Sequence, residues 1–380
     1  MSDTNTTPGT PPEPGRGFVL RVLIKAALLF AALNVLFAFT NPMPTIGRLS
    51  PYNTILPGRH RLPFGENPES YNLSLFQLEA MFASHEVAAP KPDDEYRVLI
   101  VGDSSVWGIL LEPDDTLAAQ INALGLTTSD GRRVRAYNLG YPTLSVLKDL
   151  LVISYTMPYQ PDMIVWPVTL EALPASRQIT SPLVQNNPAP VRGLIETYDL
   201  NLDTRDPGFV DLSFWGRTII GQRRAIADVT RLNIYGVMWA STGIDQYYPA
   251  DYTPRMEDLP ADEDFYGLPR PLTDESLAFD VLGAGIELAG DVPVLLVNEP
   301  MFISAGENSD IRYNFYYPRW AYDDYRRLMA AQAGASGWRY LDLWDAIAPS
   351  EFTNTAIHLT PKGSAQLAGY VGEAIAEQLP

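Results

Sequence analysis

One strand–turn stretch constrains the fold of this chain more than any other. Residues 98–101 (Val-Leu-Ile-Val) form a short apolar run typical of a buried strand in a parallel sheet. Gly102-Asp-Ser-Ser105 interrupts the run, and residues 117–124 then follow a helical pattern. Open α/β sheets bind their ligands where such a strand ends. The hydroxyl of Ser104 is therefore expected to face a crevice lined by free backbone N–H groups. Alternatively, Asp103 and Ser104 only form a turn and cap a helix.

From Arg97 onward, the chain alternates strands with helices. Strands are predicted over 97–101, 134–139, 163–168, 292–298 and 338–343. Helices are predicted over 114–124, 144–157, 275–289, 320–332 and 364–378. Strands separated by helical patterns of roughly 10–15 residues indicate βαβ units with a parallel sheet. We therefore predict one α/β domain over 96–380, with a three-layer α/β/α, flavodoxin-like fold. Residues from about 170 to 290 break the rhythm around one helix at 214–232, which predicts a large insertion over the active-site edge.

The N-terminal region predicts a membrane anchor. Residues 18–39 are almost continuously apolar, interrupted by Arg21, Lys25 and Asn34. About 20 apolar residues span a bilayer, and basic residues at the start hold that end in the cytoplasm. We therefore expect a disordered cytoplasmic tail over 1–17, a single transmembrane helix over 18–40, and everything after it outside the cell membrane. A cleaved signal peptide is the alternative, although Ala38-Phe-Thr40 is a poor cleavage site.

Composition excludes several classes of function. The 380 residues carry a formal net charge of −18, which argues against nucleic acid as a partner. Zero cysteines exclude disulfides and a thiolate nucleophile. His60 and His85 lie in a Pro-, Gly- and Asn-rich segment, 41–95, without metal-ligand spacing, so neither a metal nor a cofactor is expected. That segment, with one short helix at 73–84, either holds the domain away from the membrane or wraps its surface.

Three short motifs in order resemble the SGNH (GDSL-type) hydrolase family. They are Gly102-Asp-Ser-Ser with Gly108, Tyr137-Asn-Leu-Gly-Tyr-Pro142, and His358-Leu-Thr-Pro-Lys-Gly363 before the last helix. The resemblance covers roughly residues 97–170 and 290–378. It implies that Ser104 is the nucleophile and His358 its general base. It also implies an oxyanion hole made by the N–H groups of Ser104 and Gly140.

The chain departs from the family pattern at two places. The family places an aspartate three residues before the histidine, and here that residue is Thr355. His358 therefore acts in a dyad, another carboxylate such as Glu351 or Asp345 replaces the aspartate, or activity is weak or lost. The family also supplies an asparagine donor after the third strand, which is missing from residues 165–171. Thr169 and Asn298 are the candidate substitutes.

These features predict a membrane-anchored, extracytoplasmic serine esterase or O-acyltransferase that works through a Ser104 acyl-enzyme. Its expected substrates are acyl esters, such as acetyl groups of surface glycans, and a membrane O-acyltransferase is a candidate partner. The alternative is an inactive domain of the same fold that binds glycan or such a partner. Geometry distinguishes the two, because an enzyme needs Ser104 and His358 within hydrogen-bond reach.

Overall fold

The computed structural model describes residues 15–380, which form two compact units. One unit contains the chain up to Met43 together with residues 212–227, and the other contains residues 44–211 and 228–380. Most of the tail that we predict to be disordered, through residue 14, lies outside the described residues.

The smaller unit consists of one long helix and a short irregular segment that contacts it. Helix α1 (Arg16–Thr40) covers the predicted transmembrane segment and is long and apolar enough to cross a membrane. The short 3-10 helix η6 (Trp215–Arg217) packs beside it. The ring of Phe214 lies 5.4 Å from that of Phe39, and the N–H of Ile220 donates to Asn34 Oδ1 at 3.3 Å.

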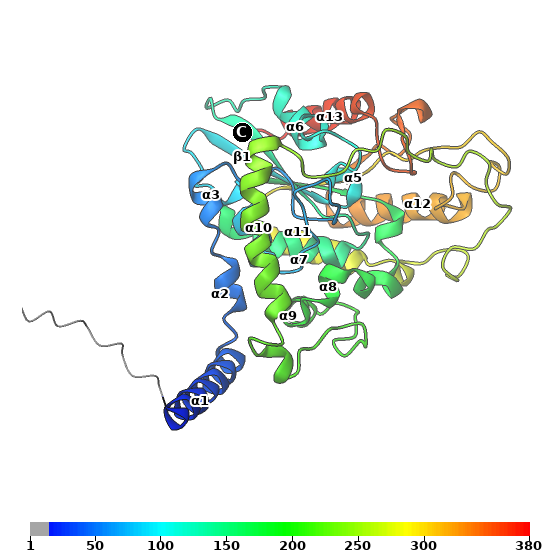
Figure 1. Cartoon of the computed structure of the whole chain (residues 1–380). Helices are drawn as coiled ribbons and strands as arrows, with labels where there is room; N and C mark the ends of the chain where they lie inside the picture. Colours follow the sequence, from blue (N-terminus) through cyan, green and yellow to red (C-terminus); the bar gives the residue numbers. More distant parts are fainter. Residues whose placement is uncertain (1–14) are drawn as a thin grey trace, which may run out of the picture. The chain divides into compact units, whose positions relative to one another are not determined.

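The larger unit is built on five parallel strands (Figure 1). Their order is β2-β1-β3-β4-β5, with bounds β1 Glu95–Gly102, β2 Arg133–Gly140, β3 Met163–Val168, β4 Val294–Asn298 and β5 Arg339–Asp342. All neighbouring pairs run in parallel, which confirms the predicted sheet. The strand order reverses direction at β1, so a crevice is expected beside the carboxyl end of that strand.

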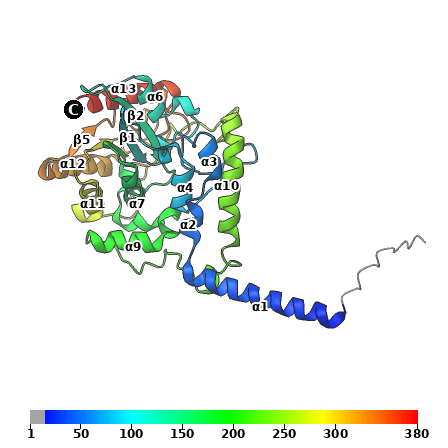
Figure 2. The same cartoon turned by 90° about the vertical axis from the view of Figure 1, so that its left-hand side faces the viewer.

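Helices cover both faces of the sheet, which confirms the three-layer α/β/α architecture (Figures 1 and 2). One face carries α6 (Leu117–Ala123) and α13 (Pro361–Ala376). The other carries α7 (Val146–Thr156), α11 (Phe279–Ala289) and α12 (Arg319–Ser336). Alternate strand residues point to opposite faces, so Val98 and Ile100 join the core beneath α6 and α13.

Residues 44–94 wrap the surface of the sheet domain rather than projecting from it. The segment holds the short helices α2 (Met43–Gly47), α3 (Pro51–Ile55) and α4 (Leu78–Ser84) and the 3-10 turn η1 (Glu86–Ala88). Leu62, Leu73 and Leu78 are fully buried. His85 is buried as well, with its Nε2 3.0 Å from the carbonyl oxygen of Asn138. Burial of these side chains fixes the segment against the strands.

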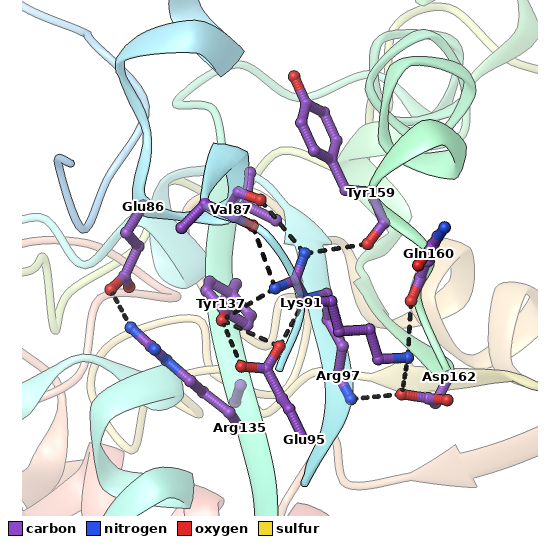
Figure 3. A network of polar contacts seen from close by, with 12 residues as sticks. Glu86, Val87, Lys91, Glu95, Arg97, Arg135, Tyr137, Tyr159, Gln160 and Asp162 are labelled. Atoms are coloured by element: carbon purple, nitrogen blue, oxygen red, sulfur yellow. Dashed lines mark hydrogen bonds and ion pairs between the residues drawn. The ribbon is translucent and has the colours of Figure 1, made fainter. Parts of the chain in front are cut away.

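A buried ionic network attaches this wrapping segment to the amino end of β1 (Figure 3). The guanidinium of Arg97 donates to Glu95 Oε1 at 2.5 Å and to the backbone oxygens of Val87 and Tyr159 at 3.3 and 3.0 Å. The hydroxyl of Tyr137 donates to the same Glu95 carboxylate at 3.0 Å. The buried charges of Arg97 and Glu95 are thus paired with each other, which offsets the cost of their burial at the amino end of β1.

The insertion leaves the sheet domain after β3 and returns before α11. The N–H of Ala278 donates to the oxygen of Leu173 at 2.8 Å, so residues 174–277 begin and end side by side. They contain α8 (Pro182–Gln185), α9 (Pro188–Thr197) and α10 (Arg223–Thr242). The predicted helix over 214–232 is misplaced, because a tight turn precedes α10: a Cβ on Gly221 would lie 2.4 Å from the oxygen of Trp215.

Candidate active site

The carboxyl end of β1 places Ser104 at the edge of the sheet. Strand β1 ends at Gly102, and the single-turn helix α5 (Ser104–Trp107) starts two residues later. Asp103 caps this helix, since its Oδ1 accepts the N–H of Ser105 at 2.8 Å. Gly108 ends it with a φ of 85°, a left-handed conformation that favours glycine. Ser104 is the first residue of the helix and is partly exposed, and an N–H at this position has no partner within the helix.

A turn before α13 brings His358 to this serine. The turn is closed by a bridge between Phe352 and Leu359, and the hydroxyl of Thr355 accepts the N–H of His358 at 3.1 Å. His358 Nε2 lies 2.9 Å from Ser104 Oγ, across 254 residues of sequence. The structure thus brings the two predicted catalytic residues within hydrogen-bond distance.

The other ring nitrogen of His358 is held by an amide, not by a carboxylate. Asn354 Oδ1 lies 2.9 Å from His358 Nδ1. An amide oxygen can only accept, so Nδ1 carries the proton and Nε2 presents its lone pair to Ser104. The predicted substitutes do not take this place: Glu351 is bound by Lys362 Nζ and Thr360 Oγ1, both at 2.6 Å, and Asp345 is exposed. The arrangement is a Ser-His-Asn triad.

Burial keeps His358 neutral. The side chain is 7 % exposed, and desolvation lowers its pKa to about 4. An adjacent carboxylate would stabilise the imidazolium and raise this pKa, but the neutral Asn354 gives no such charge. His358 is therefore ready to accept a proton at physiological pH, although it is a weaker base than a histidine paired with an aspartate.

The N–H of Gly140, predicted to bind an oxyanion, already has a partner. It donates to Asn138 Oδ1 at 3.0 Å, while Asn138 Nδ2 donates to the backbone oxygen of Val106 at 2.8 Å. A Cβ on Gly140 would lie only 2.4 Å from the N of Trp107, so glycine lets β2 approach α5 closely. Asn138, whose role sequence reasoning missed, thus connects the end of β2 to α5. Of the two predicted backbone donors, the N–H of Gly140 is therefore the one bound by a side chain of the protein itself.

The two weaker candidates for the oxyanion hole have other roles, so these predictions are corrected. Thr169 is fully buried, and its hydroxyl lies 2.8 Å from the hydroxyl of Tyr317. Asn298 is also fully buried: its Nδ2 donates to Asp342 Oδ1 at 2.7 Å, and its Oδ1 accepts the hydroxyl of Tyr325 at 3.0 Å. Asn298 therefore connects β4, β5 and α12 instead of facing Ser104.

Two buried carboxyl groups, those of Asp103 and Glu299, contact the start of α5. The hydroxyl of Ser105 donates to Glu299 Oε2, and Glu299 lies near Asp103. Burial, and then the charge of Asp103, raise the pKa of Glu299 well above its usual value. Burial also raises the pKa of Asp103, against the opposing charge of Lys148. Both effects favour the neutral form of the Glu299 carboxyl group, which its position before Pro300 in the sequence did not reveal.

Lys148 supplies the buried positive charge of this region. Its Nζ donates to the backbone oxygens of Gly102 and Tyr141 at 2.6 and 3.0 Å and lies 2.5 Å from Asp149 Oδ1. Lys148 lies on α7 and therefore connects this helix to the carboxyl ends of β1 and β2. Burial raises the pKa of Asp149 to about 6, partly offset by Lys148. A Lys-Asp pair inside an otherwise apolar helix was the sequence signal that could have identified this cluster.

The wrapping segment and the insertion meet at the loop that follows α5. Arg61 is 2 % exposed and pairs with Asp245 of the insertion, with Nε–Oδ2 and Nη2–Oδ1 distances of 2.7 and 2.6 Å. Its Nη1 donates to the backbone oxygens of Gly108 and Leu111 at 2.9 and 3.0 Å. The insertion also reaches the histidine turn, where Arg255 donates to the oxygen of Phe352 at 2.6 Å. The insertion thus contributes contacts both to the loop that follows α5, the helix of Ser104, and to the turn that carries His358.

Comparisons with known proteins find similarities among solved structures. No family model matches the sequence, and no curated protein matches it significantly. The chain is similar to solved esterases. They include a protein described as lipolytic and of the G-D-S-L family from Desulfitobacterium hafniense (11 % identity, 73 % of this chain, 98 % of that chain, TM-score 0.34). A carbohydrate acetylesterase from Sinorhizobium meliloti matches at 12 % identity, over 74 % of this chain and 99 % of that one, with a TM-score of 0.32.

An aryl esterase from M. smegmatis matches at 12 % identity, over 75 % of this chain and 99 % of that chain, with a TM-score of 0.34. These likenesses are remote, so the function proposed below depends on the geometry of the site itself.

Proposed function

We propose that this chain is a serine ester hydrolase, with Ser104 as nucleophile, His358 as general base and Asn354 as the residue that orients the base. The observation that carries the proposal is the contact of Ser104 Oγ with His358 Nε2 at 2.9 Å, while Asn354 Oδ1 holds the opposite ring nitrogen at 2.9 Å. A nucleophile, a base and an orienting group in this relation are the parts that acyl transfer needs.

The proposed reaction has two halves. His358 Nε2 removes the hydroxyl proton as Ser104 Oγ attacks the ester carbonyl carbon, and the resulting oxyanion is bound by the N–H of Ser104. His358 then gives its proton to the departing alkoxide, which leaves an acyl-serine. In the second half His358 takes a proton from water, whose oxygen attacks the acyl carbon. Collapse of that intermediate releases the acid and returns the proton to Ser104.

The proposed setting is the outer face of a membrane. Helix α1 has the length and composition of a membrane span, and Arg16, Arg21 and Lys25 near its start favour a cytoplasmic N-terminus. We propose that the domain acts there on acyl esters, such as acetyl groups of surface glycans. A glycan hydroxyl can replace water in the second half, which would make the protein an O-acyltransferase and a membrane acyltransferase its partner.

A second candidate function is a non-catalytic domain that binds glycan or a membrane partner. One observation favours it: the N–H of Gly140 is bound to Asn138, and the hydroxyl of Thr169 to Tyr317. Fewer donors for an oxyanion mean less stabilisation of the transition state, by about 2.7–4 kcal/mol for one lost donor.

Hydrolysis of p-nitrophenyl acetate by the full chain in mild detergent tests the proposal. We expect turnover, and labelling by a fluorophosphonate probe, in the wild type and in Ser105→Ala. Both should disappear in Ser104→Ala. Ser105→Ala is the matched control because it removes the neighbouring hydroxyl and leaves the His358 contact intact. A folded wild type that neither turns over nor reacts with the probe would favour the binding domain.

A further inference from the structure

The segment Leu212–Gly221 presents an apolar and basic surface that the catalytic proposal does not use. We propose that this segment, called here the interfacial segment, lies in the headgroup region of the same bilayer that α1 crosses. Its partner is thus a lipid surface. The inference rests on the proposed membrane anchoring and adds a second, non-spanning contact with the membrane.

The interfacial segment is attached to one end of α1. Phe214 contacts Phe39 with ring centroids 5.4 Å apart, and the N–H of Ile220 donates to Asn34 Oδ1 at 3.3 Å. Asn34 and Ala38, one turn apart on the same face, are the buried residues of this helix within the described structure. The remaining side chains of α1 are mostly exposed. The polar Asn34 of an otherwise apolar stretch therefore has its partner in this segment.

The position of these contacts along α1 sets the depth of the segment. The contacted residues, 34–39, belong to the last two turns of a helix of 25 residues. At 1.5 Å per residue that helix is about 37 Å long, which exceeds the roughly 30 Å of bilayer hydrocarbon. The excess of about 7 Å brings the final turn, which contains Phe39, to the interface, and a side chain that packs on this turn lies at the same level. The contact with Phe39 places Phe214 there.

The exposed side chains of the segment have the chemistry of that layer. Trp215 is 75 % exposed, Leu212 51 % and Ile220 54 %. The side chains of Arg217 and of Arg223, just beyond the segment, are exposed as well. Tryptophan favours the interface because its ring is apolar while its N–H can bond to headgroups, and arginine binds lipid phosphates. A mixture of large apolar and basic side chains fits a bilayer surface better than it fits bulk water.

The absence of cysteine from the sequence gives a direct test. Single cysteines are introduced into the full chain by Ser213→Cys in the segment, Leu28→Cys in the middle of α1, and Leu124→Cys at the end of α6. Each is labelled with an environment-sensitive fluorophore, and the protein is reconstituted in phosphatidylcholine–phosphatidylglycerol vesicles. Quenching is compared for a spin label on the lipid headgroup, a spin label deep in the acyl chain, and aqueous iodide. Ser213 is chosen so that Trp215 stays in place.

We expect the label at 28 to be quenched most by the deep spin label and the label at 213 most by the headgroup spin label. The label at 124 should respond to iodide alone. If the deep spin label quenches the label at 28 while the label at 213 responds to iodide alone, like the label at 124, the inference is wrong. The proposed membrane anchoring by α1 is then still supported. Quenching of 213 by the deep label, as strong as at 28, also contradicts a headgroup position. If neither lipid spin label quenches the label at 28, the proposed membrane anchoring by α1 is wrong. The inference about the interfacial segment, which rests on it, is then wrong as well.

Discussion

At the scale of single residues, the partner of His358 decides how this site responds to pH. Asn354 fixes the ring tautomer through its contact of 2.9 Å with Nδ1 but carries no charge. In the proposed reaction the imidazolium is therefore stabilised by orientation and not by an ion pair. This is why burial alone sets the pKa of His358, at about 4.

Replacing Asn354 by aspartate should move the acidic limb of the pH–rate profile upward. A carboxylate beside Nδ1 stabilises the protonated ring, so the pKa of His358 rises from about 4 and the neutral base is lost at a higher pH. The measurement is kcat/KM for p-nitrophenyl acetate between pH 3 and 8, which reports the free enzyme. Asn354→Ala is the control: it should lower the rate, by up to about 10⁴-fold, without moving the limb upward. An unchanged limb in Asn354→Asp would show that residue 354 does not contact the base.

The raised pKa of Glu299 predicts that a neutral side chain can replace it. Because burial and the charge of Asp103 favour the neutral form of Glu299, Glu299→Gln keeps the shape of the side chain without adding a charge and should leave stability and kcat/KM near those of the wild type. Glu299→Ala removes the acceptor of the Ser105 hydroxyl and should cost about 1–3 kcal/mol. Chemical unfolding of the full chain in detergent gives both values. Equal damage by the two substitutions would mean that an ionised carboxylate is needed.

At the scale of elements, the sequence predicted the sheet well because buried parallel strands are short apolar runs. The five predicted strands match the observed ones to within a few residues. The short motifs also predicted the pairing of Ser104 with His358. The orienting residue was missed because it depends on the shape of the turn. The Thr355 hydroxyl caps the N–H of His358, which leaves Asn354, four residues back, to face the ring.

Contacts between distant elements were beyond sequence reasoning for a different reason. Nothing in the local pattern of Arg61 or Asp245 shows that these residues pair, since they are 184 positions apart. The same holds for the Asn138 side chain, whose Nδ2 donates to the backbone oxygen of Val106, 32 positions away. Periodicity reports which face of an element is buried, but the partner of a buried polar group depends on the whole packing.

The Arg61–Asp245 pair predicts strong coupling between the insertion and the nucleophile loop. Asp245→Asn leaves the guanidinium of Arg61 buried without a counter-ion, which should lower stability by about 3–5 kcal/mol. The rate should fall too, because Arg61 holds the backbone oxygens of Gly108 and Leu111. Unfolding curves and kcat/KM are the measurements. The exposed pair Arg205–Asp203 is the matched control, since Asp203→Asn should cost less than about 1 kcal/mol.

At the scale of the whole molecule, a buried neutral histidine couples folding to acidity. His85 connects the wrapping segment to β2, and burial lowers its pKa to about 3. The unfolded chain binds a proton at this site below about pH 6.5, whereas the folded chain does not until about pH 3. Its contribution to stability is therefore complete above pH 6.5 and is lost as the pH falls below that value.

The variant His85→Gln isolates this effect, because glutamine can donate to the oxygen of Asn138 without titrating. The wild type should be the more stable protein at pH 7. The difference in free energy of unfolding should then shrink by about 1.4 kcal/mol per pH unit as the pH falls from 6 to 4. Denaturant unfolding of both proteins in detergent at a series of pH values measures it. A difference that stays constant with pH would show that His85 is accessible to protons in the folded state.

The 254 positions that separate Ser104 from His358 also matter for the synthesis of the proposed site. The serine is made first, and the histidine follows only when the turn before α13 has been added. A growing polypeptide that ends between these two positions therefore carries the proposed nucleophile without its proposed base. Under the proposed function, hydrolysis would report only those chains that have been extended past position 358.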